Sequence, residues 1–379
     1  MLRHAFLSAA IVALAAAITL VPTLANARPQ WTPSQATTWY ARQPWPVGSN
    51  YIPADAINQF EMWQPDTFNP KQIDWELGLA ESTGMTTMRV FLQDQLWTAD
   101  PAGFKQRIDA FLVIAARHHI KPLFVLFDSC WDAHPHLGKQ KDPVPGLHNS
   151  GWVQSPGIDE LSDPTTYPKL KAYVTGVIGA FAKDDRILGW DVWNEPSEKS
   201  DDGVHTGAAT GLVANLLPQV FAWARSADPT QPLTSGVFDG GDWSPQSEVA
   251  LNPIQKTQLD QSDLISFHSY SWPEEFANRI RQLQGYNRPI FCTEYMARGA
   301  GSTIDTSLPL GKTYNIAMYN WGFVDGKTQT KYPWDSYAHP YTDRQPTVWF
   351  HDLFHADGTP YRQREIDIIR SLTGKSAPQ

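Results

Sequence analysis

Two glutamates stand where a pair of carboxylates can do chemistry. Glu195 lies at the end of segment 189–196 (GWDVWNEP), and Glu294 lies at the end of segment 289–295 (PIFCTEY). Each follows a largely apolar run of the kind that forms a buried strand. Hydrolysis of a glycosidic bond requires two carboxylates that face each other across a sugar-sized gap, one as the acid and the other as the nucleophile or base.

The elements that must position these glutamates follow a regular alternation of short apolar runs and longer amphipathic stretches. Strands are expected near 50–53 and at 86–92, 121–127, 187–193, 232–238, 263–269, 289–294 and 315–323. Helical spacing of apolar residues marks 104–119, 167–181, 211–225, 273–283 and 361–372. Eight strands alternating with helices, without a break in composition, predict an α/β fold, a single-domain (β/α)8 TIM barrel over residues 28–379.

A doubly wound open sheet is the alternative fold, but no G-x-G-x-x-G or G-x-x-x-x-G-K turn follows any of the expected strands. In a barrel, the loops after the strands form the active face, so both glutamates would overhang one mouth. Two of these loops are long, residues 129–162 and 324–358, and long loops in compact domains are mostly functional. They are able either to wall off a pocket or to flank an open cleft.

The residues around the two glutamates carry a family resemblance. Trp193-Asn194-Glu195-Pro196 is similar to the W-N-E-P signature of clan A glycoside hydrolases, and Thr293-Glu294-Tyr295 resembles their nucleophile segment. These retaining (β/α) barrel enzymes include cellulases, β-mannanases and β-xylanases, and the closest likeness within the clan is to the cellulase-like family five. The resemblance covers roughly residues 48–372, and its further matches are Arg89, His268-Ser269-Tyr270 and Trp321.

The chain departs from the family at the third strand. Here Asp128-Ser129-Cys130-Trp131 replaces the usual segment that ends in histidine. The subfamily and the substrate are therefore left open by the resemblance.

The resemblance implies a role for each matched residue. Glu195 would be the general acid/base, with Trp193 as an apolar wall that favours a raised pKa. Glu294 would be the nucleophile, held ionised by donors such as Arg89 and Tyr270. In a retaining enzyme the two carboxyl groups lie about 5–5.5 Å apart.

Substrate contacts are also implied by the resemblance. Asn194 would donate to the sugar 2-hydroxyl, His268 matches a substrate-binding position, and Trp321 would form the floor of the sugar subsite nearest the cleaved bond. Each of Arg89, Tyr270 and Trp321 also has a purely structural interpretation, as a neutralising cation, a loop aromatic or a core residue.

Aromatic residues are abundant, with 16 Trp, 13 Tyr and 17 Phe. Sugar rings present apolar C–H faces that stack on indole while their hydroxyls find polar partners. Tryptophans at expected strand ends or in the loops beyond them are therefore expected to include sugar-stacking surfaces, among them Trp131, Trp193, Trp321 and Trp334, alongside Trp97, Trp152 and Trp272.

Composition limits the partners. The net charge is −9, which argues against nucleic acid because phosphate binding needs a basic face. The N-terminus has a short basic region, an apolar run over 5–21 and the Ala25-Asn26-Ala27 cleavage pattern, which predicts a signal peptide over residues 1–27 and a secreted or periplasmic protein. A membrane anchor is the alternative for this run. After cleavage no membrane association is expected, and the residues do not specify an oligomeric state.

Metal and thiol chemistry are the remaining candidates. His134, His136 and His148 share one long loop with Asp132 and Asp142, but their spacing matches no metal-ligand motif, so no metal or other cofactor is expected. Cys130 and Cys292 fall on opposite sides of the predicted barrel, too far apart for a disulfide. Two free, mostly buried thiols are therefore predicted.

The function predicted from the sequence is retaining hydrolysis of β-glycosidic bonds in a β-glucan, mannan or related polysaccharide or oligosaccharide, with Glu195 and Glu294 as the catalytic pair. A non-catalytic carbohydrate-binding barrel is the alternative from another class. A metal-dependent hydrolase built on the histidine loop ranks last.

Overall fold

The strands of the protein form one parallel sheet. The computed structural model describes residues 27–198 and 207–376, so the predicted signal peptide falls almost wholly outside the described residues. The sheet order is β5-β4-β3-β2-β1-β8-β7-β6. The strands are β1 Val47–Tyr51, β2 Thr87–Phe91, β3 Lys121–Val125, β4 Gly189–Asp191, β5 Leu233–Thr234, β6 Ile265–His268, β7 Ile290–Tyr295 and β8 Ala317–Asn320.

The sheet curls into a nearly closed barrel. β1 pairs with both β2 and β8, so the first and last strands are neighbours. The remaining seam, between β5 and β6, is linked by a single bridge between Val237 and Phe267 and by the hydrogen bond from Asp263 N to Leu233 O. The predicted (β/α)8 barrel is thus confirmed, although several strands are shorter than predicted and β1 begins earlier.

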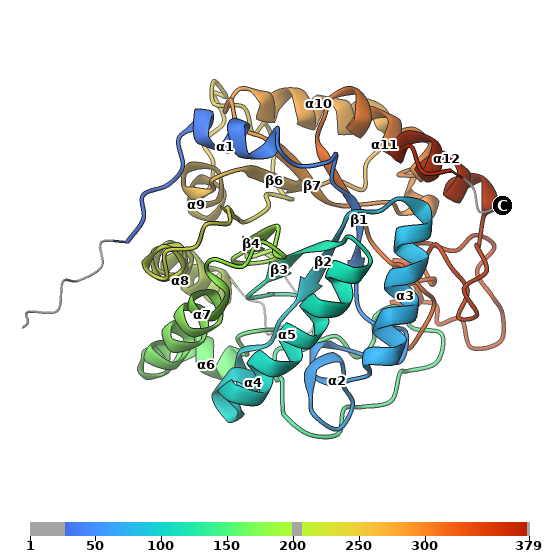
Figure 1. Cartoon of the computed structure of the whole chain (residues 1–379), viewed down its shortest axis with the longest axis horizontal. Helices are drawn as coiled ribbons and strands as arrows, with labels where there is room; N and C mark the ends of the chain where they lie inside the picture. Colours follow the sequence, from blue (N-terminus) through green and yellow to red (C-terminus); the bar gives the residue numbers. More distant parts are fainter. Residues whose placement is uncertain (1–26, 199–206, 377–379) are drawn as a thin grey trace, which may run out of the picture.

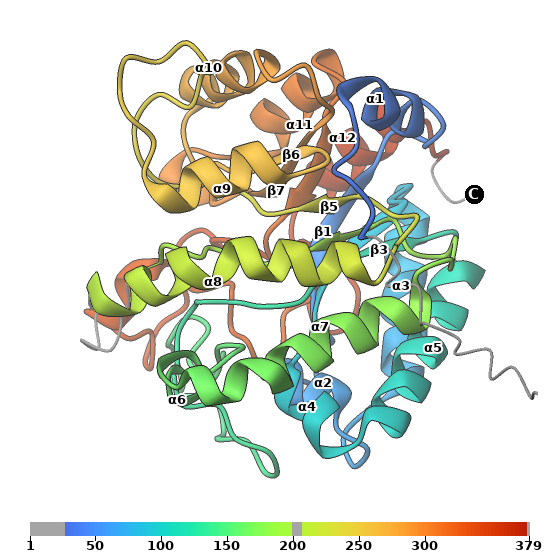
Figure 2. The ribbon, with the colours of Figure 1, turned by 90° about the vertical axis from the view of Figure 1, so that its left-hand side faces the viewer.

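Helices surround the barrel (Figures 1 and 2). The helices are α1 Pro33–Tyr40, α2 Gln59–Trp63, α3 Pro70–Thr83, α4 Asp94–Ala99, α5 Pro101–Arg117, α6 Ile158–Ser162, α7 Tyr167–Phe181, α8 Gly207–Ser226, α9 Pro253–Gln261, α10 Pro273–Gln284, α11 Ile304–Thr313 and α12 Gln363–Thr373. Short 3-10 helices are η1 Pro164–Thr166, η2 Arg298–Ala300 and η3 Trp334–Tyr337. None of the described helices has both the length and the apolar character needed to cross a membrane.

Several helices begin at an N-cap residue whose side chain accepts a hydrogen bond from the first turn. The side chain of Asn69 accepts from Gln72 N ahead of α3, and that of Asp100 accepts from Gly103 N ahead of α5. Both helices carry Pro in the first turn, where no intrahelical partner for its missing N–H is needed. These caps fix where α3 and α5 begin.

The N-terminal end of the barrel interior is filled by apolar side chains. Phe291 of β7 lies against Tyr319 of β8, and the Tyr40 ring from α1 packs on Phe291 with centroids 5.8 Å apart. α1 therefore plugs this end. The chain just before α1 is tied down as well, because Arg28 pairs with Asp263 at the β5–β6 seam.

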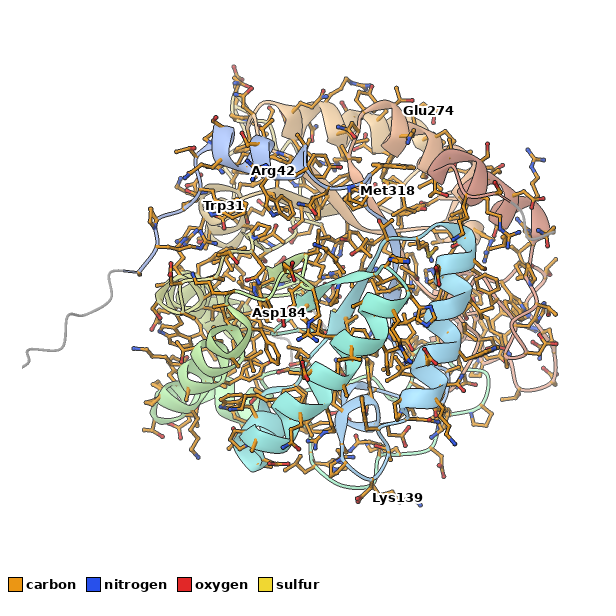
Figure 3. All side chains as sticks on the ribbon, in the orientation of Figure 1. Trp31, Arg42, Lys139, Asp184, Glu274 and Met318 are labelled. Carbon is orange, nitrogen blue, oxygen red and sulfur yellow. The ribbon has the colours of Figure 1, made fainter. Side chains whose placement is uncertain are left out.

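The opposite end of the barrel carries the long loops. Figure 3 labels Trp31 and Arg42 on the α1 side and Lys139 on the loop after β3, at opposite sides of the molecule. The loops after β3 and β8 gather at this C-terminal end, beyond the ends of the strands.

Candidate active site

The two glutamates singled out in the sequence meet at the C-terminal end of the barrel. Glu294 lies within β7, and Glu195 follows β4 by four residues. One carboxylate oxygen of each, together with a ring nitrogen of His268, lies within 4.8 Å of the others. Both line a cavity of about 930 Å³, which is at the upper end of the range for small-molecule sites.

Glu294 is held by the two donors that were predicted for it. The Arg89 guanidinium donates from Nη1 to Oε1 at 2.9 Å, and the Tyr270 hydroxyl donates to Oε2 at 2.6 Å. Burial raises the pKa of Glu294 above its usual value, while the positive charge of Arg89 and the Tyr270 hydrogen bond oppose that rise. This carboxyl is therefore the one of the pair that is best stabilised as an anion.

Glu195 has weaker donors and a strained backbone. Its Oε1 lies 2.8 Å from Nδ1 of His268, and the Cys130 thiol donates to Oε2 at 3.2 Å. Burial raises the pKa of Glu195 to about 7, opposed by the Cys130 hydrogen bond. Its φ is +43°, in the left-handed region that non-glycine residues seldom adopt and that clusters at functional sites. Glu195 is thus suited to hold a proton near neutral pH.

His268 is neutral beside this carboxyl. Burial lowers the pKa of the imidazole to about 4. Its Nδ1 lies 3.6 Å from Glu294 Oε2 as well as close to Glu195. His268 therefore bridges the two catalytic candidates without adding a full charge to either.

Arg89 fixes the geometry of the site. Its guanidinium is fully buried and donates to Asp191 Oδ2 from Nη2 at 2.7 Å, to Asn50 Oδ1 at 2.9 Å and to Asn194 Oδ1 at 2.6 Å. It thus joins β1, β2, β4 and β7 through one planar group. A guanidinium so held stays charged and keeps its direction, so the position of Glu294 is set in advance of substrate binding.

Asn194 is oriented by a second acid. Its Nδ2 donates to Asp128 Oδ1 at 2.9 Å, and Asp128 Oδ2 accepts from the Trp152 indole at 2.7 Å. Asn194 lines the cavity beside Glu195. The Asp128–Cys130 segment, where the chain departs from the family, therefore supports both Asn194 and Glu195.

Four of the tryptophans proposed as sugar-stacking surfaces line the cavity: Trp131, Trp152, Trp321 and Trp334. Trp131 stacks on Tyr337 with centroids 4.9 Å apart, and Trp321 packs edge-on against Trp152. The rings come from the ends or loops of β3 and β8, so they form one aromatic side of the site.

Trp193 requires a correction. Its side chain is 1% exposed, its indole donates to Ser129 Oγ at 2.8 Å, and its ring packs on Phe127. It does not line the cavity, so the expectation of a sugar contact is wrong. Trp97 and Trp272 also lie outside the cavity lining.

Several residues that shape the site were not singled out by sequence reasoning. They are Asn50, Asp191, Asn149, Tyr337 and His351. Asp191 had a usable signal, because an acid inside a buried apolar strand requires a partner. Asn149 and His351 had none, because their positions depend on contacts between distant loops.

The loop histidines do not assemble into a metal site. His134 and His136 are exposed, while His148 is buried and donates from Nδ1 to Tyr332 O at 2.8 Å. Within the described ranges, the group with ligand-like spacing is Glu195, His268 and Glu294. The positive charge of Arg89 already pairs with Glu294. The three residues of the group lie close together because the hydrogen bonds described above hold them in place.

The prediction for the cysteines is confirmed. Cys130 and Cys292 are both free and buried. Burial and the neighbouring carboxylates raise the pKa of the Cys130 thiol well above its usual value, so that it remains a protonated donor.

Comparison with known proteins agrees with the geometry. The family model described as cellulase (glycosyl hydrolase family 5) matches residues 57–327, more than half of the chain. The chain therefore belongs to glycosyl hydrolase family 5, whose members are enzymes that cleave glycosidic bonds.

Two curated relatives are similar over part of their length. Mannan endo-1,4-beta-mannosidase 3 of Arabidopsis thaliana is 26% identical over 185 residues, 44% of this chain and 42% of the relative. Mannan endo-1,4-beta-mannosidase F of Aspergillus clavatus is 24% identical over 131 residues, 35% of this chain and 26% of the relative. The chain thus matches less than half of the length of either relative.

Solved structures share the fold. An exo-beta-1,4-mannosidase, Op5Man5, from Opitutaceae bacterium strain TAV5 superposes with a TM-score of 0.58 at 17% identity, covering 87% of this chain and 60% of that chain. An endo-beta-1,4-mannanase from Thermotoga petrophila gives 0.54 at 14% identity, covering 90% and 80%. At these identities the likeness establishes the barrel fold.

Proposed function

We propose that this family 5 glycosyl hydrolase cleaves β-1,4-linked mannan or manno-oligosaccharides with retention of anomeric configuration. The observation that carries the proposal is the pairing of Glu195 and Glu294 within 4.8 Å, inside one cavity, in unequal environments. Retaining enzymes need the closer of the two known carboxyl spacings, because no water has to fit between the nucleophile and the sugar in the first step.

In the first step Glu294 acts as the nucleophile. Its ionised carboxylate forms a bond to the anomeric carbon while the bond from that carbon to the glycosidic oxygen breaks. Glu195 gives its proton to the departing oxygen, so the leaving sugar departs as a neutral alcohol. The charge that leaves Glu294 is the one that Arg89 and Tyr270 had stabilised.

In the second step the same two residues reverse the chemistry. Glu195, now ionised, takes a proton from a water molecule, whose oxygen attacks the anomeric carbon. The bond between that carbon and Glu294 breaks, which restores the carboxylate. Two inversions at one carbon leave the anomeric configuration unchanged.

Mannan is proposed ahead of β-glucan as the substrate because the curated relatives are both named as mannan endo-1,4-beta-mannosidases. The aromatic side of the cavity, with Trp131 and Trp321, offers stacking surfaces for a chain of pyranose rings. A stacking surface alone accepts glucan and mannan equally, so the names of the relatives, and not the aromatic rings, favour mannan.

The decisive experiment is a substrate screen with configuration analysis. Mannan, glucomannan, β-glucan and xylan are incubated with the enzyme, and the first product is followed by proton NMR. We expect mannan to be hydrolysed fastest and the β-anomer to appear first. Initial release of the α-anomer would overturn the retaining mechanism, and preference for another polymer would overturn the choice of mannan.

A matched pair of substrates tests the role of Glu195. The variant Glu195→Gln is expected to lose most activity on mannobiose but to keep rapid first-step cleavage of 2,4-dinitrophenyl β-mannoside, whose leaving group needs no proton. Equal loss on both substrates would show that Glu195 is not the acid. Hydrolysis undetectable with every polymer would favour the carbohydrate-binding alternative.

We also propose that residues 1–27 direct export and are removed, giving a secreted or periplasmic enzyme. The support is the order of basic, apolar and small-residue segments in the sequence. Cell fractionation followed by N-terminal sequencing tests this. A protein recovered from the cytoplasm with Met1 intact would contradict it.

A further inference from the structure

The long loops after β3 and β8 are fastened to each other. Backbone hydrogen bonds run from Asn149 N to Thr328 O at 2.8 Å and from Tyr341 N to Gly146 O at 3.0 Å. We name residues 144–150 and 328–341 the joined-loop wall. Its two halves are about 180 residues apart in the sequence, so it is held together by long-range contacts.

The joined-loop wall is centred on a buried histidine. His148 N donates to Ser336 Oγ at 3.0 Å, and the Tyr337 hydroxyl donates to His148 O at 2.6 Å. Both His148 and Ser336 are buried. Burial and paired backbone groups make the wall a fixed part of the structure, in contrast to loops that open on few contacts.

Gly146 allows the two halves to approach. Its φ is +75°, and a Cβ at this position would lie 2.4–2.6 Å from backbone atoms of Tyr341. A side chain of any size must therefore push the loops apart. Gly138, in the same loop, also has a positive φ of +93° but has open space around a Cβ.

The wall lies on one side of the catalytic cavity. β3 and β8 flank β1 and β2 in the sheet order, so loops from β3 and β8 that join must cross above β1 and β2. His148, Asn149 and Tyr337 line the same cavity as Glu195 and Glu294. The cavity is therefore closed on the β1–β2 side within the described part of the chain.

The orientation of the sugar follows from the proposed chemistry. The glycosidic oxygen must point to Glu195 and the anomeric carbon to Glu294. The ring behind that carbon then rests over Trp321, which follows β8 next to β1. The far end of this ring, where a β-1,4 chain would continue, points toward the joined-loop wall.

Buried polar atoms without a hydrogen-bond partner lie at that end of the site. Asn149 is 1% exposed, and neither atom of its amide has a hydrogen-bond partner among the described residues. The His351 ring donates from Nδ1 to Met296 O at 2.6 Å, which leaves Nε2 as an acceptor, also without a described partner. Buried polar groups left unpaired are costly, so a native structure normally supplies them with a partner.

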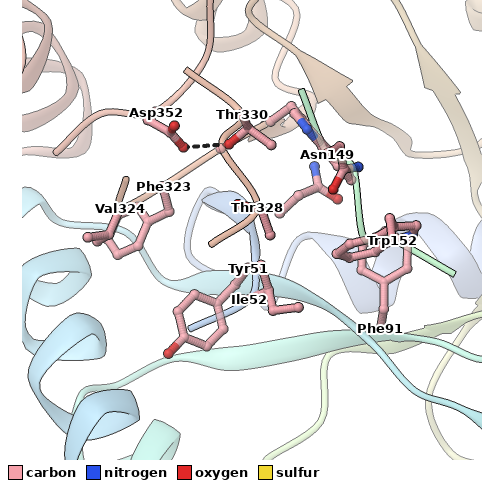
Figure 4. Close-up of a pocket in the computed structure, with 13 residues that line it drawn as sticks. Tyr51, Ile52, Phe91, Asn149, Trp152, Phe323, Val324, Thr328, Thr330 and Asp352 are labelled. Carbon is pink, nitrogen blue, oxygen red and sulfur yellow. Dashed lines mark hydrogen bonds between the residues drawn. The ribbon is translucent and has the colours of Figure 1, made fainter. Parts of the chain in front are cut away.

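A smaller cavity lies beyond Asn149. It has a volume of about 20 Å³, enough for about one water molecule. Figure 4 shows Asn149 together with Thr328 and Thr330 from the loop after β8, with Thr330 hydrogen-bonded to Asp352. Asn149 is among the lining residues of both this space and the catalytic cavity, so it stands at the boundary between them.

We propose that the joined-loop wall closes the end of the site that holds the non-reducing sugar, and that Asn149 and His351 bind hydroxyls of that terminal unit. The enzyme then removes single sugars from the non-reducing ends of chains. This inference rests on the proposed function and adds to it the position at which the chain is cut.

The first test uses mannopentaose labelled at its reducing end. We expect unlabelled mannose and labelled products that shorten by one unit at a time. Early release of labelled mannobiose or mannotriose would overturn chain-end action while leaving the mannanase chemistry intact. Hydrolysis of none of the polymers or oligomers would remove the proposed function and this inference together.

The second test opens the wall. Gly146→Ala is expected to raise the share of internal cleavage products at least threefold, while Gly138→Ala, its matched control, leaves the product pattern unchanged. If Gly146→Ala does not fold, Tyr337→Phe removes the hydroxyl bond to His148 O with less disturbance. A product pattern identical in all three variants would contradict the role of the wall.

The third test separates sugar binding from a structural role of Asn149. Asn149→Ala is expected to lower kcat/KM on mannobiose at least tenfold. Analogues deoxygenated in turn at C3, C4 and C6 of the terminal unit are measured with both proteins. For the hydroxyl that Asn149 binds, the loss of kcat/KM caused by Asn149→Ala and the loss caused by deoxygenation will not add. Either change removes the same contact. Full additivity for every analogue would show that Asn149 only supports the loop.

Discussion

At the N-terminal end of β7, Phe291 packs against Tyr40 and Tyr319, whereas three residues later on the same strand Glu294 accepts hydrogen bonds from Arg89 and Tyr270. The first end is apolar and plugged by α1. The second end is charged, hollow and lined by polar atoms without partners. A single strand thus serves two regions with different physical demands.

The two ends of the barrel have different roles: the apolar end stabilises the fold, and the charged end carries the residues proposed for catalysis. The apolar end gains from complete burial and close packing. The charged end keeps groups that would be more stable elsewhere, including a partly buried carboxyl with a raised pKa at Glu195 and a left-handed φ at the same residue. Substitutions at the two ends should therefore separate loss of activity from loss of stability.

The largest effect is expected at the charged end, for Glu294→Gln. Loss of the nucleophile should lower kcat on mannobiose by at least about 10³-fold. The free energy of unfolding should stay the same or rise, because a buried carboxylate is replaced by a neutral amide of the same shape. Steady-state kinetics and urea denaturation check the two parts. If the variant is less stable and its activity falls only in proportion to the fraction that is folded, Glu294 serves stability and not catalysis, which would contradict the prediction.

The next effect is at the apolar end, for Phe291→Ala. Removing a fully buried ring that α1 covers should lower the free energy of unfolding by about 3–5 kcal/mol. Activity per folded molecule should stay within about twofold, because Phe291 does not line the cavity and its ring packs on Trp39, Tyr40 and Tyr319. Denaturation curves combined with kinetics at low temperature test this. A large drop in kcat at unchanged stability would show that the two ends are coupled.

A smaller effect concerns the pH dependence set by Cys130. Rising pH removes the proton from Glu195, so kcat/KM should fall about tenfold per pH unit above its pKa of about 7. The Cys130 thiol stabilises the ionised form. Cys130→Ala should therefore move this basic limb to higher pH, while Cys130→Ser, which keeps a donor, should move it less.

Cys292 supplies the matched control for that shift. It is also buried, and its thiol donates to the backbone oxygen of Glu294 rather than to either carboxyl. Cys292→Ala should leave the basic limb where it is. Equal displacement of the limb in the Cys130 and Cys292 variants would show that the effect is one of packing.

The smallest effect is expected from metal removal. Prolonged dialysis against a chelator should change kcat/KM by less than about twofold, because both proposed steps use only proton transfer and a carboxylate nucleophile. Added Zn²⁺ should inhibit, since it would occupy Glu195 and His268 and displace the proton needed in the first step. Activity that disappears on chelation and returns with a metal would contradict the two-carboxylate mechanism.

The charged end was largely predictable from the sequence, because strand ends in a barrel converge on one face. Glu195, Glu294, Arg89 and Tyr270 each follow or belong to an apolar run, so the barrel hypothesis alone places them together. Trp193 was misplaced because it lies beyond the end of β4 at Asp191, where the alternation of a strand no longer fixes the direction of a side chain. Its ring turned toward Phe127 and away from the cavity.

The apolar plug and the joined-loop wall were less predictable. α1 buries only Ala36 and Tyr40, so its apolar spacing is too weak to mark a helix, although Thr32 and Pro33 form a recognisable start. The wall depends on one backbone hydrogen bond between residues 149 and 328 and another between residues 146 and 341. Such contacts leave no periodic pattern in the sequence, and so Asn149 and His351 emerged only from the structure.

The ion pair between Arg28 and Asp263 has a consequence for the order of events during synthesis. Arg28 is among the first residues made, yet its partner lies 235 positions later. The seam between β5 and β6 therefore cannot acquire this contact until more than half of the chain has been made. The segment that leads into α1 is therefore fastened late, only after the chain has reached β6.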